Sequence, residues 1–205
     1  MGMTERISSD ELIFEQLSEG NLPSEFYCGD KELDEFLRDD ALDHQNATVA
    51  MTTLVRYKGE IVAYYSLAAD CISLDKKEKR RIREEYDIPY TEFPALKICR
   101  LAVAESHKKL GIGERMVKDV IGLALDLQDI MGLRFLSVDA LKESQGFYTT
   151  LGFHINNHED EVDPRDLTVS MRFDLQPIEW DEQEAGGIAP PDENQGVLPF
   201  RDETG

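Results

Sequence analysis

PALKICRLAVAESHKKLGIGERMVKDVIGLAL (residues 94–125) and LRFLSVDALKESQGFYTTLGF (residues 133–153) decide the fold. Residues 94–104 and residues 133–140 are rich in apolar side chains, as buried strands are. Between them a helix begins after Gly111-Ile112-Gly113 and keeps its apolar residues at a helical spacing. A short helix over residues 144–151 follows, with Gly152 where a glycine ends a helix. The order strand, turn, helix, strand and short helix predicts a mixed α/β domain.

The turn before the long helix has the features of an anion site. The first N–H groups of a helix have no partner inside it, and the helix dipole adds positive charge there. Two glycines allow close approach of a ligand to the backbone. The surrounding basic residues add positive charge to an otherwise acidic protein: Lys108, Lys109, Arg115 and Lys118. The turn therefore predicts a site for a phosphate group.

These motifs resemble the acetyl-CoA-binding core of the GNAT superfamily of N-acetyltransferases. The family has [R/Q]-x-x-G-x-[G/A] at the start of its long helix, and F-Y-x-x-x-G-F on its short helix. The turn here is K-K-L-G-I-G, and Lys108 stands where the family has Arg or Gln. Lysine keeps the positive charge but loses the forked or amide hydrogen bonds. The second motif is complete over residues 147–153, FYTTLGF.

The front half of the chain resembles one branch of that superfamily, which contains toxins that acetylate the amino group of aminoacyl-tRNA. The pattern F-x-C-G-x-x-x-L-D-x-F-L lies at residues 26–37, Y-Y-S-L at residues 64–67 and R-L-A-V at residues 100–103. The resemblance implies a GNAT fold: a central mixed, mostly antiparallel, twisted sheet flanked by helices. Acetyl-CoA is then expected in the cleft beside the central strand, with no metal. It also implies a small antitoxin partner, and a homodimer is plausible.

The resemblance implies site residues as well. The strand before the turn offers backbone groups to the pantetheine arm, and the turn holds the pyrophosphate. The expected coenzyme-binding residues are Leu101, Ala102, Val103, Lys108, Lys109, Leu110, Gly111, Ile112, Gly113 and Glu114. Tyr148 is expected to protonate the leaving thiolate, since a phenol with a pKa near ~10 suits that role. A structural tyrosine closing the short helix is the alternative.

The proton acceptor for the attacking amine is left open. Tyr65, Ser66, Asp70 and His44 are candidates, and each has a structural alternative. An aminoacyl-tRNA amino group, whose pKa is lower than that of a lysine side chain, depends less on such a base.

The remaining pattern predicts further elements and one boundary. We expect strands at residues 11–17, 48–57, 61–72 and 167–175, and a helix capped by Asp30. We expect the first 175 residues to form the domain that resembles the GNAT superfamily, and residues 176–205 to form an acidic tail without hydrophobic periodicity. From Asp174 onward the chain has nine acidic residues and one basic residue, so this part carries −8 of the net −20.

That net charge argues against wholesale nucleic-acid binding and equally favours plain solubility or cationic partners. The basic run DKKEKRRIREEY at residues 75–86 reads either as a solvated helical face or as an RNA-contacting patch. The three cysteines form no C-x-x-C pair, and His154 and His158 lie four apart outside a predicted helix, so no metal is expected. No membrane span or signal peptide is evident, which favours the cytoplasm.

The sequence thus predicts an acetyl-CoA-dependent N-acetyltransferase in which a primary amine attacks the thioester directly. The acceptor stays open between aminoacyl-tRNA and a small or protein-borne amine. A non-catalytic module that binds acyl-CoA is the alternative of another class.

Overall fold

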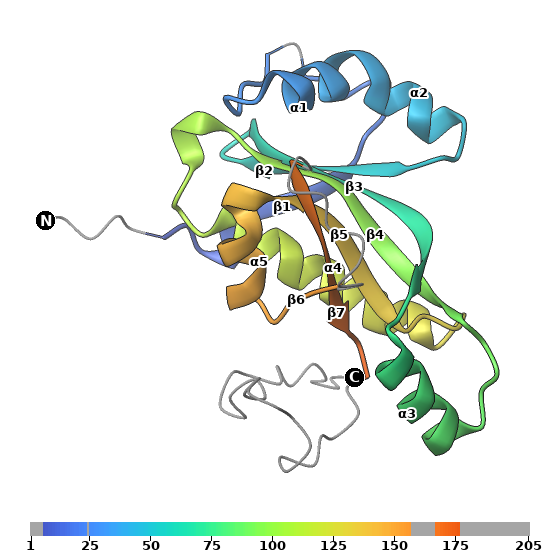
Figure 1. Cartoon of the computed structure of the whole chain (residues 1–205). Coiled ribbons are helices and arrows are strands. Elements are labelled where there is room, and N and C mark those ends of the chain that lie inside the picture. Colours follow the sequence, from blue (N-terminus) through green and yellow to red (C-terminus); the bar gives the residue numbers. More distant parts are fainter. Residues whose placement is uncertain (1–5, 24, 157–166, 177–205) are drawn as a thin grey trace, which may run out of the picture.

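The computed structural model of the chain describes residues 6–23, 25–156 and 167–176 (Figure 1). A seven-stranded sheet has the order β1-β2-β3-β4-β5-β7-β6. Its strands are β1 (Leu12–Gln16), β2 (Met51–Tyr57), β3 (Glu60–Ser73), β4 (Glu92–Val103), β5 (Phe135–Leu141), β6 (His154–Ile155) and β7 (Thr168–Asp174). The helices are α1 (Lys31–Glu35), α2 (Ala41–Asn46), α3 (Lys76–Tyr86), α4 (Ile112–Gln128) and α5 (Gln145–Thr150).

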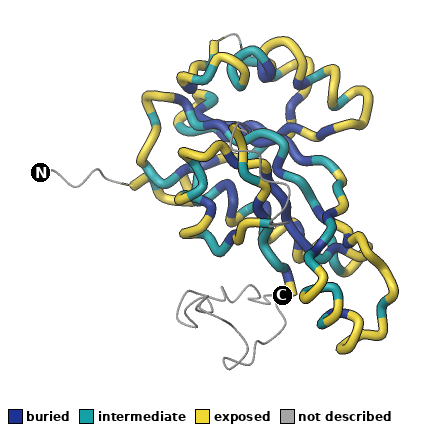
Figure 2. The backbone as a smooth tube through the Cα atoms, viewed as in Figure 1, coloured by how far each residue is buried: buried dark blue, intermediate teal, exposed yellow. Residues whose placement is uncertain are grey.

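Neighbouring strands pair antiparallel except β4 and β5, which run parallel. This mixed, mostly antiparallel sheet with flanking helices confirms the predicted fold class. Helices α4 and α5 lie on one face and α1 and α2 on the other, while α3 stands at the end of the sheet (Figure 1). Burial follows these layers, with the sheet enclosed between exposed helix surfaces (Figure 2).

Three apolar clusters hold the layers together. The largest joins one sheet face to the buried stripe of α4, which includes Met116, Val117 and Val120. A second joins α1, α2 and the π-helical segment between them (Phe36–Asp40) to the other face. A third seats α3 through Ile82. Since each amphipathic helix has one apolar stripe, each buries it against a separate part of the sheet.

Most predicted boundaries agree with the structure, and two differ for physical reasons. Strand β2 begins at Met51 rather than at residue 48, because the preceding residues turn back to close α2. The N–H groups of Ala47, Thr48 and Val49 donate to carbonyls of Asp43, Gln45 and His44, at 2.9 Å each. The short strand β6 places His154 against β7, where the sequence suggested a passage from strand to loop. His158 and the predicted acidic tail beyond Gln176 lie outside the described residues.

Within the described part of the chain, no helix combines the length and apolar character needed to cross a membrane. Most of the basic run forms α3, with Asp75 as its N-cap and a capping box between Asp75 and Glu78 that closes the first turn. Three further short segments are 3-10 helices: Ser9–Glu11, Glu105–His107 and Lys142–Ser144.

Candidate active site

The central feature of the sheet is a fork between β4 and β5. The two strands pair only from Ala95 with Phe135 to Ile98 with Val138. Beyond that point β4 stays with β3 as far as Val103, and β5 stays with β7 as far as Leu141. The inner edges of both strands are therefore unpaired with each other, and the backbone groups of β4 there can bind an extended ligand as an added strand would.

A bulge marks the point where the fork opens. Ser66 pairs with Arg100 and Leu67 pairs with Ile98, so Cys99 has no opposite residue on β3. A bulge of this kind bends the strand and redirects its side chains and amides. The predicted pantetheine segment follows at once: Leu101 and Val103 pack on the α4 side, and Ala102 is buried on the α1 side. The structure thus places all three predicted strand residues on the free edge of the fork.

The predicted phosphate turn closes the other end of the site. Lys109 and Gly111 both have left-handed backbones, with φ of 66° and 87°. Gly111 is the N-cap of α4 and caps it with no side chain, so the first N–H groups of the helix stay open to a ligand. A Cβ atom on Gly113 would lie 3.4 Å from the Phe147 ring, which shows how closely the turn meets α5.

The side chains of the turn do not all face this site. Ile112 is buried in the core, so only its N–H group is available to a ligand. Lys108 forms an ion pair with Glu105 at 2.5 Å, and its ammonium group lies 3.6 Å from where a Cβ on Gly29 would stand. The hydrogen bond that Lys108 donates to Glu105 raises the pKa of Lys108. Hydrogen bonds from Lys118 and Arg6 lower the pKa of Glu114 in the first turn.

The turn suits the phosphates of a coenzyme. In the same first turn, the Nε atom of Arg115 is buried without a hydrogen-bond partner in the described structure. A buried guanidinium donor without an acceptor is costly, and a phosphate oxygen is the acceptor that guanidinium groups bind best. The open N–H groups, the two left-handed residues and this donor together fit a pyrophosphate.

Tyr148 lies on α5 and is buried, with 6% of its surface exposed. Its ring packs edge-on against Phe147 and Phe153, with centroids 5.0 and 5.4 Å apart. Burial raises the pKa of Tyr148 to about 12. The phenol therefore keeps its proton throughout the neutral range, as a proton donor must.

A polar cluster on the opposite face of β4 and β5 is absent from the sequence predictions. Lys97 pairs with Asp139 at 2.6 Å, and the buried Ser137 hydroxyl donates to Asp70 at 2.6 Å. Burial lowers the pKa of Lys97, but the hydrogen bond to Asp139 and the charges of Asp139 and Asp70 together outweigh it and raise that pKa. Burial raises the pKa of the neighbouring Cys99 thiol, which keeps it protonated. Alternation along β5 places Ser137 and Asp139 on one face, and that spacing was the available signal.

Three of the four candidate bases have structural roles in this arrangement. The Tyr65 hydroxyl donates to Asp119 at 2.8 Å, and burial raises its pKa. Ser66 is buried against Thr52, with 2.7 Å between the hydroxyl oxygens. His44 packs edge-on against Phe36, with centroids 5.3 Å apart. Asp70 alone belongs to the polar cluster near the fork.

Residues 14–153 match the Acetyltransferase (GNAT) family. The chain belongs to the GNAT acetyltransferase family. Membership makes it an acetyl-CoA-dependent N-acetyltransferase, which favours an enzyme over a non-catalytic module that binds acyl-CoA. No group of three or more His, Cys, Asp or Glu side chains in the described ranges is arranged to hold a metal ion.

Known relatives extend this finding. The chain is 27% identical over 158 residues to a tRNA-acetylating toxin of Mycobacterium tuberculosis (strain ATCC 25618 / H37Rv), covering 77% of this chain and 90% of that protein. AtaT complexed with acetyl-methionyl-tRNAfMet has a TM-score of 0.67 and 23% identity, covering 80% of this chain and 94% of AtaT. A mutant of KacT has a TM-score of 0.66 and 22% identity, covering 80% and 95%. At these identities the two structures establish the shared fold.

Proposed function

We propose that this acetyltransferase transfers its acetyl group to the α-amino group of an aminoacyl-tRNA. The similarity to a tRNA-acetylating toxin over 77% of the chain carries this proposal. It also suggests a toxin that a small antitoxin protein neutralises, since a structure of AtaT holds the C-terminus of the antitoxin AtaR. Aminoacyl-tRNA places the reaction in the cytoplasm. A homodimer remains part of the proposal.

Helix α3 supports an RNA acceptor despite the net charge of −20. Lys76, Arg80 and Arg83 are exposed on it, and within the described part of the chain one ion pair involves them, between Arg80 and Glu84 at 3.7 Å. Surface pairs at such distances are weak, so the cations remain available to phosphates. Helix α3 contacts β4 at Phe93, five residues before Ile98, where the fork opens. At ~3.3 Å per residue, the distance along β4 from α3 to the fork is about 17 Å, which an acceptor stem spans easily.

The fork assigns different tasks to its two faces. Acetyl-CoA supplies an acetyl group activated as a thioester. Tyr148 approaches from the α4 side and donates its proton to the leaving sulfur. Backbone N–H groups of β4 after the bulge at Cys99 polarise the acetyl carbonyl. The acceptor enters from the opposite face of the sheet, where Lys97 and Asp139 lie. The placement of these residues around the fork supports the proposed roles.

The reaction is tested by incubating the protein with labelled acetyl-CoA and total aminoacyl-tRNA. Wild-type protein is compared with Tyr148→Phe, and with Tyr27→Phe as a matched control because Tyr27 is 66% exposed. We expect label on the tRNA fraction with wild type and Tyr27→Phe, and a strong loss with Tyr148→Phe. Alkaline release of the labelled amino acid then shows whether the acetyl group is on its α-amino nitrogen.

Two outcomes would contradict the proposal. No label on tRNA, from protein shown to bind acetyl-CoA, rejects aminoacyl-tRNA and directs the search to polyamines and protein lysines. Equal labelling by wild type and Tyr148→Phe keeps the substrate but removes Tyr148 from the proton-donor role.

A further inference from the structure

The family motif begins with Arg or Gln, and in this chain that position is Lys108. Its ammonium group is held by Glu105 and faces Gly29, as described above. The Lys108 side chain, which the motif predicts to bind the coenzyme phosphates, is therefore directed to Glu105 and Gly29 and not to Gly111. A different residue occupies the space beside that glycine.

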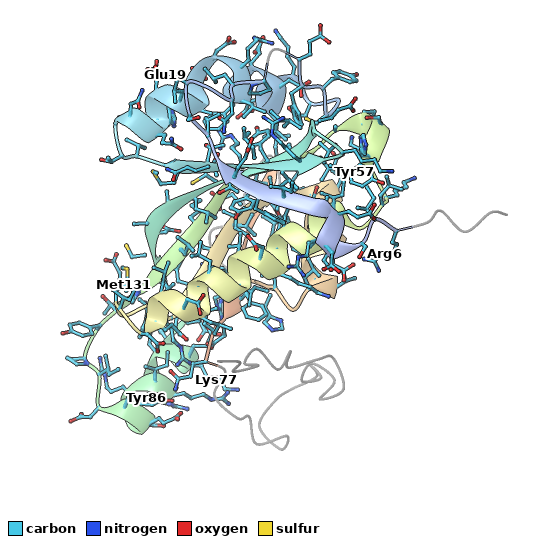
Figure 3. All side chains as sticks on the ribbon, turned by 180° about the vertical axis from the view of Figure 1, so that it is seen from behind. Arg6, Glu19, Tyr57, Lys77, Tyr86 and Met131 are labelled. Carbon is cyan, nitrogen blue, oxygen red and sulfur yellow. The ribbon has the colours of Figure 1, made fainter. Side chains whose placement is uncertain are left out.

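That residue is Arg6, from the segment before β1. Its Nε and Nη2 atoms lie 2.8 and 3.0 Å from where a Cβ atom on Gly111 would stand. Figure 3 shows the labelled Arg6 beside the first turn of α4, far from Met131 beyond the other end of the helix. A side chain at position 111 would displace this flexible guanidinium. The left-handed φ is what favours glycine there, and the absence of a Cβ atom lets Arg6 approach the turn closely.

The approach of Arg6 is fixed by its neighbours. The N–H group of Ile7 donates to the carbonyl of Leu110 at 3.1 Å, and the Ile7 side chain packs against the main core. The Arg6 guanidinium forms an ion pair with Glu114, which also accepts a hydrogen bond from Lys118 at 2.9 Å. With 63% of its side chain exposed, Arg6 can move to a ligand without leaving a buried position.

We propose that Arg6 binds the coenzyme pyrophosphate and does the work of the arginine missing from position 108. Its planar guanidinium offers two parallel donors to phosphate oxygens, which the ammonium group of a lysine cannot do. Those donors join the open N–H groups of α4. Glu114 holds the guanidinium at the turn until a phosphate replaces its carboxylate. This inference rests on acetyl-CoA binding alone, and the identity of the acceptor does not enter it.

The test is calorimetric titration of the full chain with acetyl-CoA. We expect Arg6→Gln to weaken binding about tenfold and Arg6→Lys to restore only part of the loss. Arg38→Gln is the matched control, because Arg38 is also exposed and paired to a carboxylate, Asp39, but lies on the helical layer across the sheet. It should leave the affinity unchanged. Thermal unfolding of each ligand-free variant confirms that the fold is intact.

Two further measurements separate a phosphate contact from a structural role. Glu114→Gln should tighten acetyl-CoA binding, because it removes the carboxylate that competes for Arg6. Arg6→Gln should weaken the binding of 3′-dephospho-acetyl-CoA by the same factor as the binding of acetyl-CoA, because both ligands carry the pyrophosphate. Unchanged or tighter binding by Arg6→Gln would overturn the proposal, as would a loss confined to the 3′-phosphorylated form. Because only coenzyme binding is measured, the result stands apart from success or failure with aminoacyl-tRNA.

Discussion

The turn before α4 and the helix α3 both gather cations in an acidic protein, but they are built differently. At the turn, left-handed residues at Lys109 and Gly111 aim backbone N–H groups at one point. On α3, the exposed cations project from a regular helix whose buried apolar contact with the sheet is made by Ile82. Backbone geometry therefore suits the turn to the proposed role of binding one anion of defined shape. Side chains make α3 a diffuse surface suited to a chain of phosphates.

This difference teaches how charge and geometry divide recognition. A backbone site depends less on ionic strength than an array of charged side chains does, and it is very sensitive to a single Cβ atom. A surface of flexible cations tolerates such changes but weakens steadily with salt, because each contact releases counterions. The substitutions on α3 and at Gly111 below each disturb one of these sites and leave the other intact.

The largest effect is expected at Tyr148, which belongs to neither charged region. Tyr148→Phe should lower kcat by about 10²- to 10⁴-fold, the usual contribution of a positioned proton donor. Binding of acetyl-CoA and of tRNA should both stay within twofold of wild type. Single-turnover kinetics with separate binding titrations make the distinction. A matching loss of coenzyme affinity would mean that the hydroxyl supports packing instead.

The α3 surface should give the next largest effect. Arg80→Gln with Arg83→Gln should weaken aminoacyl-tRNA binding about tenfold at low salt and reduce the salt slope by about 2 units. Acetyl-CoA affinity should not change. Filter binding over a range of salt concentrations measures this, with Arg38→Gln plus Lys58→Gln as the charge-matched control. An identical drop in both double variants would reduce α3 to a contributor of net charge.

At the turn, Gly111→Ala tests the backbone site. A left-handed alanine costs about 1 to 2 kcal/mol, and its Cβ would displace Arg6. We expect roughly that loss in the free energy of unfolding and at least about tenfold weaker acetyl-CoA binding. Gly122→Ala is the control, because Gly122 lies in α4 with nothing within 4 Å of its Cβ position. This substitution should raise the free energy of unfolding by up to about 1 kcal/mol. If Gly111→Ala binds acetyl-CoA as tightly as the wild type, the turn is not the phosphate-binding site.

The smallest expected effect is the pH dependence on the alkaline side. Burial holds the pKa of Tyr148 at about 12, so the donor stays protonated far above neutrality. We expect kcat/KM to rise as the acceptor amine loses its proton, near its ordinary pKa of ~8 or below, and then to stay level through pH ~10. Initial rates in overlapping buffers measure the profile. A falling limb below pH ~9 would identify a different acid.

The coenzyme half was largely predictable because its signals are local. Strand, glycine turn, helix and the FYTTLGF motif occupy residues 94–153 in the order in which they act. The phosphate turn and the placement of Tyr148 on a short helix depend on neighbouring residues only. The predicted edge Leu101–Ala102–Val103 also agrees, since one strand carries all three residues.

The polar cluster on the proposed acceptor side was not predictable for the opposite reason. Asp70, Lys97 and Asp139 come from three strands, and only the sheet order β3-β4-β5 brings them into one cluster. The π-helical segment Phe36–Asp40 joins α1 to α2 where the sequence suggested one regular helix. The polar cluster depends on the long-range register of the strands. The π-helical segment is accompanied by stacking of Phe36 on Tyr64.

The sequence by itself determined the family, the coenzyme, the glycine turn and the catalytic tyrosine candidate, because short-range spacing specifies helices, turns and motif residues. Tertiary structure alone decided that β4 and β5 separate after Ile98 and Val138 and that Lys108 pairs with Glu105. It also decided that Arg6 lies beside Gly111, although more than a hundred residues separate them in the sequence. These contacts depend on which distant segments pack side by side. No periodicity within a single segment records them.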